Sequence, residues 1–136
     1  MAAGKYSFTI EQGSTVDFEI VYKDSNSDPI DLTLYTARMQ IRPSIGSDIV
    51  HMTLSSSLGP CGTGLNLSGS GGINASKPLS SGSIGIYISA ASSSQLSFNE
   101  GFYDLELMSG SGDCTTVTRL LMGQVKLSNE ITIGSF

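Results

Sequence analysis

The chain has 136 residues and a mass of 14.2 kDa, carries a formal net charge of −5, and contains 39% hydrophobic but only 14% charged residues. This length suits one domain with a single core, and the composition differs from that of disordered chains, which are poor in apolar residues and highly charged. The acidic balance argues against nucleic acid as a partner, because phosphate binding needs a basic surface. We expect no signal peptide and no membrane partner, because the sequence has neither a signal-type apolar segment near Met1 nor an apolar run of about 20 residues.

The first third of the chain predicts three strands. Residues 6–10 and 16–22 alternate apolar and polar side chains, as half-buried strands do, and a turn at 11–14 separates them. A polar loop, residues 23–29, then leads to a third strand at 35–42. One side of this strand carries Tyr35, Ala37, Met39 and Ile41, and the other carries Thr36, Arg38, Gln40 and Arg42. Pro43 is expected to end the strand, since proline cannot donate a hydrogen bond to the ladder.

The middle of the chain is rich in serine and glycine. Short strands are predicted at 49–54 and 84–88, and the segment 55–83 between them forms either a flexible linker or a hairpin. We favour a hairpin with a mobile tip, whose two arms face each other across Ser-Gly-Ser-Gly-Gly. The facing residues are Leu65 and Leu67 on one arm and Ile73 and Ala75 on the other. Residues 89–97 predict a single helical turn, capped by Ser89 and with Leu96 pointing inward.

Two longer strands are predicted near the C-terminus, at 103–108 and 115–127, with a Ser/Gly turn at 109–113. The last strand breaks its own alternation, because Leu120 and Met122 are out of phase with the apolar residues on either side. This break predicts a bulge between Leu120 and Gly123. Ile131 and Ile133 are expected to add a final short pairing.

These elements predict an all-β protein. Seven to nine short strands, spaced about ten residues apart and joined with at most one short helical turn, are typical of an immunoglobulin-like antiparallel β-sandwich. We expect one such domain over residues 1–136, with a closed barrel as the main alternative. Tyr103 follows a Gly-Phe pair in the way that such sandwiches approach their sixth strand, where a tyrosine forms a corner hydrogen bond; a plain core position is the other interpretation.

The sequence contains no recognisable catalytic, cofactor-binding or metal site. Its single histidine, His51, cannot build the common triads or a His-rich metal site. Cys61 and Cys114 lack metal-ligand spacing, so we expect two unpaired thiols, although a disulfide is the alternative. The carboxylate pairs Asp17/Glu19 and Asp104/Glu106 have a spacing that glycosidases could use, but the chain has no Trp to stack on sugars. We therefore expect a protein that is not an enzyme and uses no cofactor.

A polar sheet face is the candidate functional surface. In an immunoglobulin-like sandwich the third and sixth strands are neighbours, so Arg38 and Arg42 would face Asp104 and Glu106, and Arg119 would extend the ladder. This ladder either orders the outer face or, because arginine suits bidentate contacts with carboxylates, docks on another protein. The candidate docking residues are Arg38, Gln40, Arg42, Asp104, Glu106 and Arg119.

Three stretches carry a resemblance to a known family: IEQGSTVDFEIVYKDSNSDPIDLTLYTARMQIR, GSIGIYISAA and EGFYDLELMSGSGDCTTVTRLLMGQVKLS. Across residues 7–42 and 83–128 the chain resembles small virion proteins of tailed bacteriophages that are associated with the tail and baseplate. It is more loosely similar to the immunoglobulin-like N-terminal domain of phage baseplate upper proteins. The matching pieces are Asp31-Leu32-Thr33 with Ala37 and Arg38, and Tyr103-Asp104-Leu105-Glu106 with Thr118-Arg119-Leu120. Leu34 stands where such sequences often have glycine, which argues against a tight turn there.

The resemblance implies a structural role without catalysis. We expect a component of a phage virion, assembled in the host cytoplasm and located in the tail, the baseplate or a fibre-attachment collar. Its partners would be other virion proteins, in many symmetric copies. One alternative is a capsid decoration or cement protein. Another is a carbohydrate-binding adhesion module that would use loop tips at 55–63 and 69–72.

Overall fold

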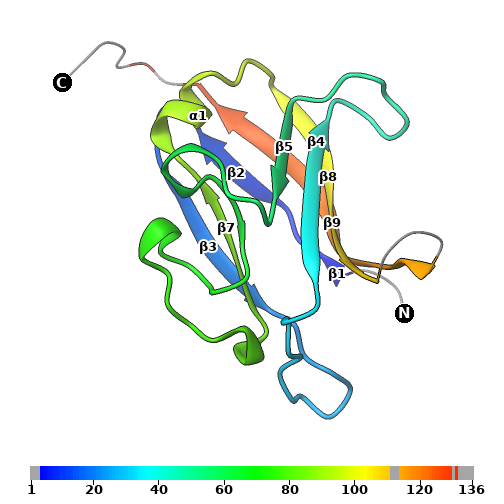
Figure 1. The fold of residues 1–136 in the computed structure, drawn as a ribbon. Coiled ribbons are helices and arrows are strands. Elements are labelled where there is room, and N and C mark those ends of the chain that lie inside the picture. Colours follow the sequence, from blue (N-terminus) through cyan, green and yellow to red (C-terminus); the bar gives the residue numbers. More distant parts are fainter. Residues whose placement is uncertain (1–3, 111–113, 130, 132–136) are drawn as a thin grey trace.

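The alternating segments form two sheets that pack face to face in the computed structural model, which describes residues 4–110, 114–129 and 131 (Figure 1). The larger sheet has the strand order β1-β9-β8-β4-β5, with β2 also on β9, and the smaller has the order β3-β7-β6. All described pairs are antiparallel except those of β1 and β2 with β9. The strands are β1 (Gly4–Lys5), β2 (Phe8–Glu11), β3 (Val16–Val21), β4 (Thr36–Arg42), β5 (Met52–Ser55), β6 (Gly64–Asn66), β7 (Ser83–Ile88), β8 (Glu100–Ser109) and β9 (Thr116–Ser128). The predicted all-β sandwich is confirmed.

The core lies between the sheets and is built from the apolar positions of the alternation. Ala37, Met39 and Ile41 of β4 are buried, as predicted, while Tyr35 lies just before the strand and is half-buried. Leu105 and Leu107 of β8 and the three isoleucines of β7 complete the central layer. Burying each such side chain contributes about 1.5–3 kcal/mol. Successive side chains of a strand point to opposite faces, so the residues between the buried ones of β4 and β8 point away from this core.

The helical turn forms where the sequence predicts it. Helix α1 (Ala90–Ser94) is capped by Ser89, whose hydroxyl accepts a hydrogen bond from the amide of Ser92 at 3.2 Å, and Leu96 is buried. The Ser93 hydroxyl donates to the carbonyl of Ser14 at 2.7 Å, which ties the helix to the turn before β3. Three single 3₁₀ turns, which the sequence did not predict, lie at Pro60–Gly62 (η1), Gly72–Asn74 (η2) and Leu79–Ser81 (η3).

The predicted bulge lies at Leu120. Leu105 of β8 is opposite Leu121, but the next residue, Glu106, is opposite Arg119, so β9 carries one extra residue. In an unbroken ladder Arg119 would oppose Leu107 and face the core, because side chains alternate across a strand. The bulge therefore turns Arg119 outward, to the same side as Glu106.

Several boundaries differ from the prediction. Strand β5 begins at Met52, and Ile49 and Val50 before it are exposed. Strand β4 ends before Pro43, as predicted.

A tight turn does form at Leu34, since the amide of Tyr35 donates to the carbonyl of Leu32 at 3.0 Å. Leu34 adopts no positive φ there, so the turn does not require glycine. Ile131 is exposed and outside any described strand, and Ile133 lies outside the described residues.

The predicted hairpin between 65–67 and 73–75 is wrong. Strand β6 pairs with β7, and Ile73 lies in η2 with 75% of its surface exposed. Gly69, Gly71 and Gly72 of the predicted turn do have positive φ, but the chain that follows them enters η2 instead of a second strand. The segment instead lies against the outer side of the small sheet, where a Cβ on Gly85 of β7 would meet the Gly69 carbonyl at 2.1 Å.

The acidic side chains of β3 hold this covering segment. The Glu19 carboxylate accepts the amide of Ser70 at 3.0 Å and pairs with the Lys77 ammonium at 2.5 Å. The Asp17 carboxylate accepts the amide of Gly71 at 3.1 Å. The tip at 69–72 is thus packed on the sheet, which counts against its use as a free carbohydrate-binding loop.

Candidate docking groove

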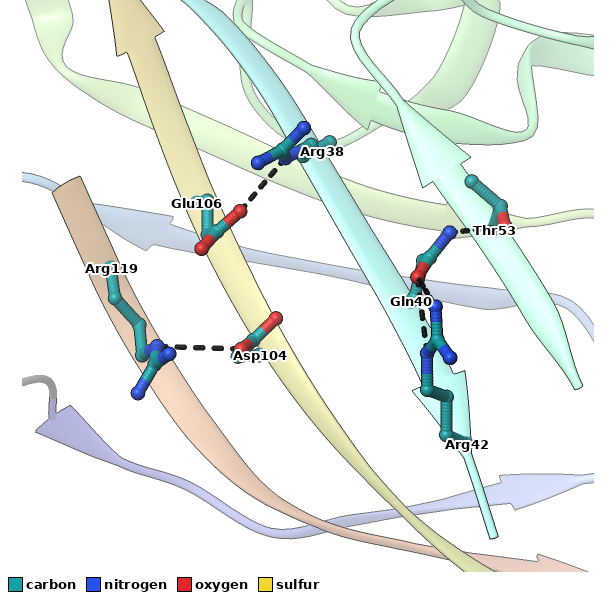
Figure 2. Close-up of polar contacts among 7 residues, drawn as sticks. All are labelled: Arg38, Gln40, Arg42, Thr53, Asp104, Glu106 and Arg119. Atoms are coloured by element: carbon teal, nitrogen blue, oxygen red, sulfur yellow. Dashed lines mark hydrogen bonds and ion pairs between the residues drawn. The ribbon is translucent and has the colours of Figure 1, made fainter. Parts of the chain in front are cut away.

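The outward side chains of β4, β8 and β9 form one polar face on the large sheet (Figure 2). In the β4–β8 register Arg38 is opposite Glu106 and Gln40 is opposite Asp104. In the β8–β9 register Glu106 is in turn opposite Arg119. The three strands therefore bring together residues that are up to 81 positions apart in the sequence.

Two ion pairs order this face. The Arg38 Nε lies 2.8 Å from the Glu106 Oε1, and the Arg119 Nε lies 3.3 Å from the Asp104 Oδ2. Both arginine side chains are about half exposed, and such surface pairs typically contribute about 0–1 kcal/mol. The predicted contact between Arg38 and the β8 carboxylates is confirmed, as is the participation of Arg119. These pairs position the charges more than they stabilise the fold.

Arg42 does not face a carboxylate, which corrects the prediction. It is opposite Phe102, because four residues along β4 from Arg38 correspond to four residues back along β8 from Glu106. The Arg42 Nε and a terminal amino group donate to the Gln40 Oε1 at 3.2 and 2.7 Å, and the other amino group donates to the Ser47 carbonyl. Gln40 in turn donates to the Thr53 hydroxyl at 3.4 Å. Arg42 is thus held in one orientation by neutral acceptors.

This polar face is hollowed into an open groove of about 810 Å³. All six predicted docking residues line it, so the sequence identified residues that share one site. The sequence did not identify the loop 44–48 after β4, the N-terminal Lys5, or Phe102, Met122 and Gln124, which also line the groove. Pro43 marks the end of β4, but where the following loop lies depends on tertiary packing. Ile45 on this loop is 84% exposed and gives the groove an apolar wall.

The groove differs in charge from the rest of the molecule. Four of the seven Lys and Arg residues of the chain line it, against three of the twelve Asp and Glu residues. Its formal charge is therefore +1, whereas the remainder of the chain carries −6. Since complementary potentials favour association, the groove is suited to an acidic partner surface.

Tyr103, which also lines the groove, joins two distant segments by a hydrogen bond. Its buried hydroxyl donates to the carbonyl of Tyr6 at 2.6 Å, 97 positions away in the sequence. The corner hydrogen bond considered from the sequence would instead reach a nearby upstream residue, so this contact is a different one. It joins β8 to the segment between β1 and β2. Burial, with a smaller contribution from Tyr6, raises the pKa of Tyr103 to about 12.

The other candidate residues lie outside the groove. The pKa of Glu19 is lowered by its hydrogen bond with Lys77 and by the amide of Ser70. His51 stacks on Phe98, with ring centroids 4.3 Å apart. Cys61 and Cys114 are both exposed and unpaired, so the expected free thiols are present.

The described residues offer no candidate metal site or membrane-spanning helix. Within residues 4–110, 114–129 and 131, no three His, Cys, Asp or Glu side chains are grouped as a metal ion would require. None of the helices in that part of the chain is long and apolar enough to cross a membrane. Neither the known protein-family models nor the curated proteins include a match to this sequence. The groove is thus the candidate site that the described residues offer.

Proposed function

We propose that this protein is a non-enzymatic structural component of a tailed-phage particle, located in the tail, baseplate or collar, and that it docks on other virion proteins through the groove. The resemblance of residues 7–42 and 83–128 to small tail-associated virion proteins supports the location. The observation that carries the docking role is the groove itself, with its preordered arginines and its charge opposite to that of the remaining surface.

The arrangement of the side chains favours protein docking. Association costs about 0.5–1.5 kcal/mol for each flexible side chain that becomes ordered, and Arg38, Arg42 and Arg119 are already held by hydrogen bonds or ion pairs. Arginine is enriched at interfaces, where its planar group makes several hydrogen bonds and stacks on apolar surfaces. The exposed Ile45 at the rim adds the apolar contact that such interfaces combine with polar ones. The groove therefore offers both kinds of contact.

The location is tested by fractionating purified particles. Heads and tails are separated, and this chain is quantified in each fraction by mass spectrometry. We expect enrichment with tails. Enrichment with heads would instead identify a capsid decoration protein, and absence from both fractions would refute a virion role.

The docking role is tested by Arg38→Glu. This change replaces a cation of the groove by a carboxylate that would oppose an acidic partner surface, and since like charges at an interface cost several kcal/mol, we expect incorporation into particles to fall by about tenfold or more. The isolated domain should remain folded, because the pair it loses is exposed and is worth about 1 kcal/mol at most. Lys126→Glu is the matched control, since Lys126 is an exposed residue of β9 that does not line the groove. Equal incorporation of the two variants would contradict docking through this face.

A further inference from the structure

The loop formed by residues 23–31 projects from the end of the sandwich at which β4 begins (Figure 1). It is acidic, since Asp24, Asp28 and Asp31 outnumber Lys23. The loop is also closed by its own hydrogen bonds. The Asp24 carboxylate accepts the amides of Asn26 at 2.8 Å and Asp28 at 3.0 Å, and the Asp24 amide donates to the Asp28 carbonyl at 2.9 Å. A loop held in this way loses little conformational entropy on binding.

Asp28 is the carboxylate that this loop presents. Asp28 is exposed, and within the loop only its backbone amide and carbonyl form hydrogen bonds. Among the described residues, no hydrogen bond or ion pair engages the Asp28 side chain. Asp24 and Asp31, by contrast, use their carboxylates within the chain, Asp31 with Thr33 at 2.5 and 3.0 Å. The loop therefore presents one carboxylate, on a backbone held by hydrogen bonds, that no described residue pairs with.

Arg42 is the corresponding positive charge in the groove. It is half-buried and fixed by Gln40 and Ser47, yet no ion pair in the described part of the chain includes it. Three of its five N–H groups are used by these two neighbours, which leaves two for a further acceptor. A carboxylate that reached them would make charge-assisted hydrogen bonds, roughly twice as strong as neutral ones.

The Asp28 carboxylate of the same chain does not reach Arg42. The loop precedes β4 and Arg42 ends it, so the seven residues of the strand, at about 3.4 Å each, separate them by roughly 20 Å. Figure 1 shows the loop and the 43–51 segment at opposite ends of β4. A contact between these two features therefore has to join different molecules.

We propose that the groove receives the 23–31 loop of a second copy of this chain, with Asp28 of one copy bound to Arg42 of the next. The proposal rests on the proposed function, in which the groove is the docking surface. Its basis is charge complementarity: the groove carries +1 and the loop −2, while the rest of the molecule is acidic. The contact is head-to-tail, so repetition generates a ring if the rotation closes and a filament if it does not.

Such a contact is small, and we expect it to be weak between two isolated chains. In a ring or a particle, each copy is held at both its loop and its groove, and the effective concentration of the second contact strengthens the first. The association should also weaken with salt, because the Debye length falls to about 10 Å at 0.1 M ionic strength and to about 3 Å at 1 M.

The test is analytical ultracentrifugation of the full chain from about 10 µM to about 1 mM, the concentration range of weak contacts. The wild-type protein should self-associate at low ionic strength. Asp28→Arg should weaken association by at least about tenfold, because it places two cations together. The Asp28 backbone bonds do not depend on its side chain, so this variant should fold. Arg42→Glu should have the same effect, and the double variant Asp28→Arg/Arg42→Glu should restore association by exchanging the two charges.

Two control variants make the same changes of charge elsewhere. Lys126→Glu matches Arg42→Glu, and Glu100→Arg matches Asp28→Arg; both control residues are exposed and lie outside the groove. A wild-type chain that stays monomeric over the whole range would overturn the proposal, and so would a double variant that associates no better than Asp28→Arg. Neither result would contradict the docking role of the groove, because that role is tested separately by the incorporation of Arg38→Glu into particles.

Discussion

Gly85 lies at the centre of β7, where the strand is in direct contact with the Ser/Gly-rich segment that covers the small sheet. A Cβ at this position would lie 2.1 Å from the Gly69 carbonyl oxygen, whereas ordinary contacts of this kind are 3.4 Å or longer. Gly85→Ala therefore requires the covering segment to move away by about 1.3 Å, or the strand to distort by a similar amount. The glycine is required by this close approach and not by its φ, which is not positive.

The cost of this substitution follows from the contacts that such a shift breaks. A movement of 1.3 Å takes the Ser70 amide beyond hydrogen-bonding distance of Glu19 and loosens the Glu19–Lys77 pair. Overpacking typically costs about 1–3 kcal/mol, and each surface hydrogen bond lost adds about 0.5–1.5 kcal/mol. We expect Gly85→Ala to lower the free energy of unfolding by about 2–4 kcal/mol, which corresponds to roughly 6–15 °C in Tm for a domain of this size.

Urea denaturation followed by circular dichroism measures this difference. The matched control is Gly59→Ala, because a Cβ on Gly59 would meet its nearest neighbour at 3.5 Å, an ordinary contact, and its φ is not positive. That variant should stay within about 0.5 kcal/mol of the wild type. Hydrogen exchange of the Ser70 and Gly71 amides should accelerate in Gly85→Ala alone. If Gly85→Ala were as stable as the Gly59 control, the covering segment would not be packed on β7.

Two further predictions concern titratable groups. Tyr103→Phe should lower the free energy of unfolding by about 1–2 kcal/mol, because the Tyr6 carbonyl loses its hydrogen-bond donor. The wild type should also lose stability as the pH rises from about 10, the pKa of an unfolded tyrosine, toward about 12, the pKa of Tyr103 in the fold. The Phe variant should lack this alkaline loss. Unfolding of both proteins across the alkaline range, followed together with phenolate absorbance, tests this expectation. A Phe variant whose stability falls with pH as steeply as that of the wild type would contradict it. Glu19→Gln should flatten the acid profile, since a carboxyl whose folded pKa is lowered below 4.5 stabilises the fold above that pH and loses its contribution as the pH falls. Denaturation midpoints of both proteins across the acid range test this, and parallel profiles would refute it.

The alternation of apolar residues was sufficient to predict most of the fold. Burial on one face imposes a period of two, so strands β4, β7, β8 and β9 could be found without knowing their partners. The Ser89 cap was predictable because it depends on local hydrogen bonding. The break in the alternation at Leu120 predicted a bulge. The consequence of that bulge, an outward-facing Arg119, appears only once β8 is paired with β9.

The candidate site was predicted in part. Residues that alternate with the core had to face outward, so five of the six members of the polar face follow from periodicity, whereas Arg119 faces outward only because of the bulge in β9. The partner of Arg42 could not, because it depends on the β4–β8 register, and a register is set by the packing of both strands rather than by either sequence alone. The loop 44–48 and Lys5 were missed for a similar reason, since they reach the groove from outside its strands.

The sequence by itself determined most of the strands, the end of β4 at Pro43 and which strand faces are polar, because these follow from side-chain periodicity, proline and local capping. Only the tertiary structure decided the path of the 55–83 segment, whose glycines permit many conformations and whose position is set by the Asp17 and Glu19 carboxylates of a distant strand. It also decided that the polar face is a groove, and that one of its arginines, Arg42, is held in place by the neutral acceptors of Gln40 and Ser47. Contacts between distant segments have no counterpart in local sequence patterns, and they are the features on which the proposed function depends.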